Sequence, residues 1–165
     1  MGRRGFLVSG AAAVLAGCSA GPHIPKYNGP EVTRVVVVKE RRKMYLLHND
    51  QILKDYQIGL GFAPNGDKKV EGDGRTPEGR YVIDRRNPNS NFYLSVGISY
   101  PNEDDIAEAK ALGADPGGNI FIHGEARKNR GKRPDWTAGC IAVKDKEIEQ
   151  VYAMVQDGTV IDIFP

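Results

Sequence analysis

The chain has 165 residues, a length that suits one domain with a core of its own. It carries 23 basic and 21 acidic residues, for a formal net charge of +2. Two of the basic residues, Arg3 and Arg4, lie in an N-terminal segment that we expect to be removed, which leaves 21 basic against 21 acidic residues. This neutral balance gives no reason to expect a nucleic-acid partner.

The N-terminal segment, residues 1–18, has the pattern of a secretory signal. A short basic start is followed by an apolar run over residues 6–16 and by small residues before Cys18. The apolar run is too short to span a bilayer stably, and it has no polar face that would suit a helix of a folded domain. Within the segment, "RRGFL" resembles a twin-arginine export signal, although paired arginines also begin ordinary signals, and "LAGC" resembles a bacterial lipobox.

These resemblances imply an exported lipoprotein of the cell envelope or periplasm, anchored to a membrane by a lipid on Cys18. They leave open whether the membrane is the inner or the outer one. We expect the mature chain to continue through a flexible tether, residues 19–31, which is rich in Pro and Gly and has no periodicity. His23 lies in this tether, where we expect an exposed linker residue. The folded domain then covers residues 32–165.

Short β-type runs dominate the domain. Branched and aromatic residues predict strands at residues 33–40, 43–48, 51–60, 79–84, 92–99, 118–124, 139–143 and 159–164. Asn49 and Asp50 have the chemistry of a hairpin turn between the second and third strands. Asn102 is placed as the N-cap of a helix that ends near residue 112, and a second helix is predicted over residues 145–156. Together these elements indicate a mainly β domain of short strands with two helices.

Two Gly-rich stretches imitate cofactor sites. "GLGFAPNG" has Pro64 where a dinucleotide loop needs its third glycine, and no helix follows. "NGDKKVEGDG" lacks the regular carboxylate spacing and the closing glutamate of a calcium loop. Zinc would have one available cysteine and two histidines, His48 and His123, that lie far apart in the sequence. We therefore predict neither a cofactor nor a metal, and no catalytic role for His48.

Cys140 and His123 carry the chemistry that the sequence suggests. Acylation of Cys18 would leave Cys140 without a disulfide partner in an oxidising compartment. A buried inert cysteine is one explanation, and a nucleophile activated by a neighbouring imidazole is the other. His123 ends a predicted strand and Cys140 begins one, with 16 residues between them, among which Gly124 and Gly139 give the backbone freedom beside each residue. Gly139 would also let nearby amides face an oxyanion. The spacing alone leaves both explanations open.

The loop between these two residues is strongly basic. Glu125 and Asp135 are outnumbered there by Arg127, Lys128, Arg130, Lys132 and Arg133. Such a run either forms a solvated surface or creates an electrostatic field that steers carboxylates toward the site. Trp136 is either a packing residue or the wall of a cleft.

These elements resemble a known family. "IHG" and "TAGCIAV", with "GRTPEGRYVI" upstream, are similar to the L,D-transpeptidase (YkuD-type) family of cell-wall enzymes, and "RNPNS" and "ISYPN" to its YafK-like branch. The resemblance implies that residues 32–165 form a β-sandwich catalytic domain. It also implies that Cys140 is the nucleophile, His123 the general base, and Gly124 the residue whose backbone carbonyl orients that base. The turn at residues 75–79 would lie near the cleft.

The element around the cysteine departs from the family pattern at two positions. Ala138 and Ala142 stand where the family usually has a histidine and an arginine that help to hold the substrate or the oxyanion, whereas Thr137 matches the usual Ser/Thr. The resemblance therefore places Thr137, Ala138 and Gly139 at the substrate and oxyanion position. The thioacyl chemistry is compatible with these changes, but the choice of acyl acceptor is left open.

Three functions follow as alternatives. The first is a cysteine L,D-transpeptidase that acts on peptidoglycan stem peptides, releases the terminal D-alanine and passes the acyl group to an amine, a protein amine included. The second is a peptidoglycan amidase or carboxypeptidase, in which water is the acceptor. The third is a non-catalytic wall-binding lipoprotein in which Cys140 is inert; the presence of both His123 and Cys140 argues against it.

Overall fold

The computed structural model describes residues 21–125, 129 and 134–165. This part of the chain forms one curled sheet of eight strands with two helices, in the predicted order. The strands are β1 (Arg34–Val38), β2 (Lys43–His48), β3 (Gln51–Gln57), β4 (Gly79–Asn87), β5 (Ser95–Ile98), β6 (Phe121–His123), β7 (Ile141–Ala142) and β8 (Val160–Phe164), and the helices are α1 (Glu103–Ala111) and α2 (Asp145–Met154). The prediction of a mainly β domain is confirmed.

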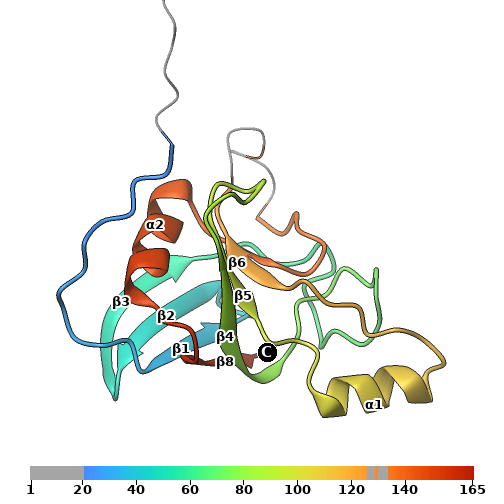
Figure 1. The fold of residues 1–165 in the computed structure, drawn as a ribbon. Coiled ribbons are helices and arrows are strands. Elements are labelled where there is room, and N and C mark those ends of the chain that lie inside the picture. The colour runs from blue at the N-terminus through green and yellow to red at the C-terminus, as the bar shows by residue number, and fades with distance from the viewer. Residues whose placement is uncertain (1–20, 126–128, 130–133) are drawn as a thin grey trace, which may run out of the picture.

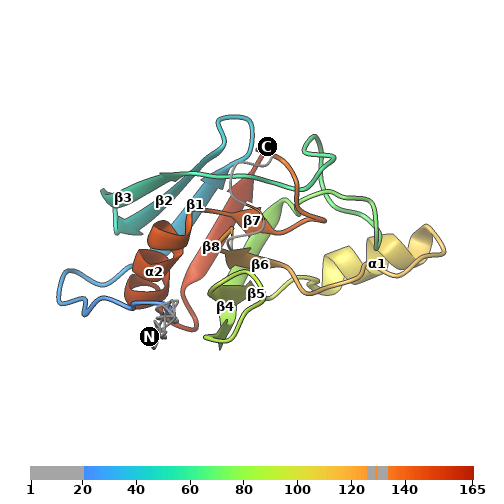
Figure 2. The same cartoon turned by 90° about the horizontal axis from the view of Figure 1, so that it is seen from above.

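The sheet has the order β3-β2-β1-β8-β4-β5-β6-β7. β4 pairs with β8 through its first half and with β5 through its second half, so it belongs to both halves of the sheet. The register of β4 shifts between Ile83 and Arg85, and an irregularity of this kind bends a strand. Two pairs are parallel, β1 with β8 and β6 with β7. The curled sheet therefore has two halves that enclose one core, with β6 and β7 at one edge (Figures 1 and 2).

The core follows from the alternation of apolar residues along the strands. Successive side chains of a strand point to opposite faces, so every second residue reaches the interior. In β1, Val35 and Val37 are fully buried while Arg34 is exposed. The same alternation buries Met44, Leu46, Tyr81, Ile83, Ile161 and Ile163.

The two helices have different surroundings. In both ribbon views α1 lies at one end of the molecule, away from α2 (Figures 1 and 2). The predicted cap of α1 is confirmed, because the Asn102 side chain accepts from the N–H of Asp105 and the Asp105 carboxylate accepts from the N–H of Asn102. α2 buries Ile148 and Val151 against β5 and β6. Neither helix of the described residues is long and apolar enough to cross a membrane.

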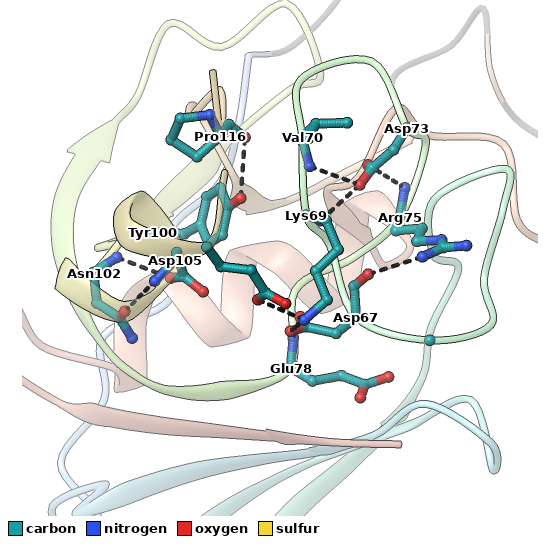
Figure 3. A network of polar contacts seen from close by, with 12 residues as sticks. Asp67, Lys69, Val70, Asp73, Arg75, Glu78, Tyr100, Asn102, Asp105 and Pro116 are labelled. Atoms are coloured by element: carbon teal, nitrogen blue, oxygen red, sulfur yellow. Dashed lines mark hydrogen bonds and ion pairs between the residues drawn. The ribbon is translucent and has the colours of Figure 1, made fainter. Parts of the chain in front are cut away.

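A long connection, residues 58–78, joins β3 to β4 and is held by its own charged side chains (Figure 3). The Asp73 carboxylate accepts from the backbone N–H groups of Lys69, Val70 and Arg75 and from the buried ammonium of Lys68. Although burial alone would raise the pKa of Asp73, these hydrogen bonds hold it below its usual value. In the stretch that imitates a calcium loop, the Asp73 carboxylate is thus already bound by lysine and backbone donors.

A buried lysine fixes the other end of this connection. Lys39 is 2% exposed, and its ammonium donates to the carbonyl oxygens of Gly66 and Thr76 and to the Glu78 carboxylate at 2.6–2.9 Å. Because an ammonium has three protons, these three acceptors satisfy it completely. Lys39 therefore ties the end of β1 to the turn at residues 75–79.

Candidate active site

His123 is the last residue of β6 and is 2% exposed. Its Nδ1 lies 2.6 Å from the carbonyl oxygen of Gly124, and since a carbonyl oxygen can only accept, Nδ1 carries the proton. The other ring nitrogen, Nε2, is then the basic one. Burial lowers the pKa of His123, although the bond to Gly124 works in the opposite direction. The imidazole is therefore neutral at pH 7 and able to accept a proton.

Two aromatic rings enclose the imidazole. The Phe92 ring is stacked on it, with 4.4 Å between ring centroids and 26° between planes. The Trp136 ring meets it edge-on at 5.6 Å. Trp136 also lines the larger cavity described below, so it is at once a packing residue and a wall of the cleft.

Cys140 lies directly before β7 and is partly exposed. Its Sγ donates to the carbonyl oxygen of Asn119 at 3.5 Å and accepts from the N–H of Phe121. Burial raises the pKa of the thiol, while the Phe121 N–H and the charge of Lys68 lower it. Among the residues that the structure describes, no hydrogen bond joins Sγ to His123. The raised pKa of the thiol and the lowered pKa of the imidazole both favour the neutral form.

Two cavities bring Cys140 and His123 together. One has a volume of about 560 Å³ and the other of about 280 Å³, and Phe92, His123 and Cys140 line both. The larger is completed by Asn129, Trp136, Thr137 and Ala138. The smaller is completed by Asn87, Ser90, Asn91, Ser95, Asn119 and Phe121. The thiol and the imidazole therefore stand at the junction of two spaces, each large enough for part of a small substrate.

The turn before Cys140 is shaped by Thr137 and Gly139. The Thr137 hydroxyl donates to the carbonyl of Cys140 at 2.7 Å and accepts from the N–H of Gly139 at 3.2 Å. Gly139 has φ +135, and a Cβ at this position would lie 2.8 Å from the carbonyl oxygen of Arg75. The N–H groups of Ala138 and Cys140 have no acceptor within the described part of the chain. Gly139 thus shapes the turn, and the two neighbouring amides are the ones left for an oxyanion.

The turn at residues 75–79 lies beside this element, as the resemblance implied. The Arg75 carbonyl contacts Gly139, and the Thr76 hydroxyl accepts from the N–H of Gly61. Gly61 and Phe62 in turn pair with Thr137 through the backbone. The buried ammonium of Lys39 therefore supports the cysteine turn through Thr76.

The structure places the remaining candidate residues outside both cavities, or does not describe them. Ala142 is buried, and its backbone exchanges two hydrogen bonds with Gly59. Asp135 binds the guanidinium of Arg42, and the His48 ring is bonded to the carbonyl of Glu31, outside both cavities. Cys18 and the basic residues 127, 128, 130, 132 and 133 lie outside the described residues.

The sequence did not identify Phe92, Asn119 or Asn129 as cavity residues. Nothing in the local sequence marks them as residues of a site. Within the described ranges, no group of three or more His, Cys, Asp or Glu side chains could hold a metal ion.

Comparisons with known proteins bear on the family and the fold. The family model of the YkuD L,D-transpeptidase catalytic domain matches residues 32–163. The chain is 27% identical over 127 residues to the Escherichia coli K12 protein named putative L,D-transpeptidase YafK, a match that covers 73% of this chain and 46% of YafK.

Two solved structures share the fold. The helical cell shape determining protein Pgp2 from Campylobacter jejuni is 30% identical with a TM-score of 0.63, over 87% of this chain and 51% of that one. An L,D-transpeptidase from Mycobacterium smegmatis is 13% identical with a TM-score of 0.55, over 81% of this chain and 59% of that one, which concerns the fold alone. The chain spans about half the length of YafK and Pgp2. Because the family model covers most of its residues, the chain belongs to the YkuD family of L,D-transpeptidase catalytic domains.

Proposed function

We propose that the chain is a cysteine enzyme of the bacterial cell wall that acts on peptidoglycan stem peptides through a thioacyl intermediate. The observation that carries this proposal is the contact of His123 Nδ1 with the Gly124 carbonyl, in a residue that shares its cavities with Cys140. A hydrogen bond to Gly124 holds its proton on Nδ1, and burial keeps the ring neutral, so Nε2 is a free base in a cavity that Cys140 also lines. A base in this state is what a thiol with a raised pKa needs in order to react near neutral pH.

The proposed reaction has two halves. His123 Nε2 takes the proton of Cys140, and Sγ attacks the carbonyl carbon of the L-to-D peptide bond. In this reaction the amides of Ala138 and Cys140 would receive the oxyanion. The C–N bond then breaks, the terminal D-alanine leaves with the proton from His123, and a thioester remains on Cys140. In the second half an acceptor attacks the thioester, gives its proton to His123, and releases the thiol.

The acceptor distinguishes two versions of this function. An amine acceptor makes the enzyme an L,D-transpeptidase, and water makes it an amidase or carboxypeptidase. One observation favours the second version, because Ala138 presents only a methyl group to the larger cavity where the family usually has a histidine. A site with fewer groups to orient an amine leaves more room for water. The transpeptidase remains the first proposal because it is the activity for which the family is named.

We further propose that the protein works at the cell envelope as a lipoprotein anchored through Cys18. The support is the sequence pattern of residues 1–18 and the cell-wall role that the family name implies. Pgp2, a relative, is described as a helical cell shape determining protein. A corresponding influence of this chain on cell shape, and a protein acceptor for its acyl group, are part of the same proposal.

Mass spectrometry of muropeptides tests the enzymatic proposal. Tetrapeptide muropeptides are incubated with the wild-type chain and with Cys140→Ser, each with and without an added amine such as glycine or a D-amino acid. We expect loss of D-alanine with the wild type only, and a product extended by the amine if the enzyme is a transpeptidase. Loss of D-alanine without incorporation identifies the hydrolase. Equal turnover by Cys140→Ser, or binding of muropeptides without turnover by the wild type, contradicts the nucleophile.

A further inference from the structure

The stacking of Phe92 on His123 depends on a short turn between β4 and β5, residues 90–94. The N–H of Leu94 donates to the carbonyl of Phe92 at 3.1 Å, and the residue between them, Tyr93, has φ +79. This is the hydrogen bond and the φ of a γ-turn with positive φ, a rare and strained conformation for a residue with a bulky side chain. Strained backbone of this kind persists only where its surroundings hold it.

The same turn holds the backbone that fixes the base. The N–H of Gly124 donates to the carbonyl of Leu94 at 3.2 Å. A Cβ at Gly124 would lie 2.8 Å from the carbonyl oxygen of Phe92, so the two backbones are in close contact. Gly124 is also the residue whose carbonyl accepts the Nδ1 proton of His123. The turn therefore contacts both the ring of His123, through Phe92, and the carbonyl that orients it.

A buried carboxylate holds the side chain of Tyr93. The Tyr93 hydroxyl donates to Glu149 Oε1 at 2.5 Å, and Glu149 lies on α2 with 3% of its surface exposed. The backbone N–H of His23, in the tether, donates to the same oxygen at 3.0 Å, and Lys146 is a more exposed third partner. Although burial alone would raise the pKa of Glu149, these bonds hold it below its usual value, so it is ionised at neutral pH. Figure 1 shows the tether running along α2.

From these contacts we infer that Tyr93 and Glu149 are positioning residues of the active site: together with the N–H of His23, they hold the strained turn that keeps Phe92 stacked on His123. Glu149 does not touch the cavities, and its effect passes through Tyr93 to Phe92. When the Tyr93 hydroxyl or its acceptor is removed, the turn relaxes and Phe92 withdraws from the imidazole. Water then reaches the His123 ring, and the effect of burial on this imidazole becomes weaker.

The catalytic importance of these residues rests on the proposed function. Their positioning role does not, because it can be tested without substrate. The measurement is an NMR titration of the His123 ring in the full chain, for wild type, Tyr93→Phe and Glu149→Met, which has no acceptor at the position of Oε1. The control is Tyr56→Phe, which also removes a buried tyrosine hydroxyl bonded to α2, at Gln150, but one that has no contact with the turn. Two titratable groups from other elements face this region: Cys140 lines the same cavities as His123, and Asp145 Oδ1 lies 2.8 Å from where a Cβ of Gly124 would be. Neither is changed.

We expect the His123 pKa to rise toward 6.5 in Tyr93→Phe and Glu149→Met, and to stay at the wild-type value in Tyr56→Phe. Alkylation of Cys140 at neutral pH should slow about tenfold in the first two variants, because an imidazole that Phe92 no longer holds is less well placed to take the thiol proton. A purely structural role predicts a lower melting temperature in all three variants with an unchanged His123 pKa, and that result overturns the inference. If His123 shifts as expected but Cys140→Ser still turns over muropeptides, the positioning role stands and the proposed function fails.

The contribution of the tether is tested by a second pair of variants. His23→Pro removes the N–H that donates to Glu149, whereas His23→Ala keeps it and removes only the ring. We expect His23→Pro to raise the His123 pKa by less than Tyr93→Phe does, and His23→Ala to leave it unchanged. Equal pKa values in the two variants exclude the tether from the support of the turn.

Discussion

The imidazole of His123 donates its Nδ1 proton to the carbonyl oxygen of Gly124, the next residue in the chain, across 2.6 Å. This bond decides the tautomer, since it leaves Nε2 without a proton. The close packing around Gly124 explains why the residue after the histidine is a glycine. A Cβ there would lie 2.8 Å from both the Phe92 carbonyl and the Asp145 carboxylate, so a larger residue would move the carbonyl that orients the ring.

The Thr137 hydroxyl should be required for both the stability and the reactivity of the cysteine turn. Thr137→Val keeps the shape of the side chain but removes the bonds to the Cys140 carbonyl and the Gly139 N–H. We expect it to lower the free energy of unfolding by about 1–3 kcal/mol, because the buried partners are left unpaired. Urea denaturation measures this loss, and acylation of Cys140 by a carbapenem measures the reactivity. Thr137→Ser keeps the hydroxyl and should retain most of both; a serine variant as impaired as the valine one would contradict the role of the hydroxyl.

Gly139 should tolerate alanine less well than Gly72, another glycine with positive φ. Gly72 has φ +78 and open space around its missing Cβ, whereas Gly139 has φ +135 and the Arg75 carbonyl 2.8 Å away. We expect Gly72→Ala to cost about 1 kcal/mol, from backbone strain alone, and Gly139→Ala about 2–5 kcal/mol, from strain and overpacking together. Chemical denaturation of both variants checks the difference. Equal losses would show that the contact with Arg75 has no effect on stability.

Lys39 should be a stabilising residue of the connection behind the cysteine turn. In Lys39→Met the Glu78 carboxylate and two carbonyl oxygens lose their common donor, and we expect a loss of about 3 kcal/mol. Lys43→Met is the control, because it breaks an exposed ion pair with Asp55 and should cost much less. Thermal or urea unfolding compares the two variants. A smaller loss for Lys39→Met than for Lys43→Met would refute this assignment.

The lipid anchor remains a prediction from the sequence. If Cys18 is acylated, the wild-type protein sediments with membranes and its mature mass includes the lipid. Cys18→Ala should be found in the soluble fraction or remain unprocessed. Unchanged fractionation and an unchanged mass for this variant would remove the lipoprotein proposal, without affecting the chemistry at Cys140.

The strands could be predicted from the sequence because apolar residues alternate along them, but their ends could not. Six predicted strands are shorter in the structure. Three of them begin late, and a residue with positive φ precedes each: Tyr93 before β5, Asn119 before β6 and Gly139 before β7. The pattern of apolar residues predicts which face of a strand is buried, whereas tertiary contacts decide where the backbone leaves the sheet.

The same limit applies to the site. His123, Gly124 and Cys140 could be proposed because the family pattern contains them. Phe92 could not, since only the strained turn brings its ring onto the imidazole. Lys39 could not be recognised as a buried residue either, because its three acceptors come from a connection without regular structure.

The central claim is that His123 is the base that activates Cys140, and the pH dependence of Cys140 labelling tests it most directly. The rate of alkylation by chloroacetamide is measured by peptide mass mapping in the full chain, for wild type and for His123→Ala, after circular dichroism has confirmed that the variant is folded. Peptide mapping separates Cys140 from Cys18.

The sign of the pH dependence follows from the two pKa shifts. Because burial lowers the pKa of His123, its neutral form persists as the pH falls to 6.5 and is lost only at lower pH. Wild-type labelling should therefore be fast at pH 7, hold down to about pH 6.5 and fall below it. In His123→Ala, labelling at pH 7 should be about 10²–10⁴-fold slower and should recover only as the pH approaches the raised pKa of the thiol. If both proteins instead show the same profile, set by the thiol alone, His123 is not the base.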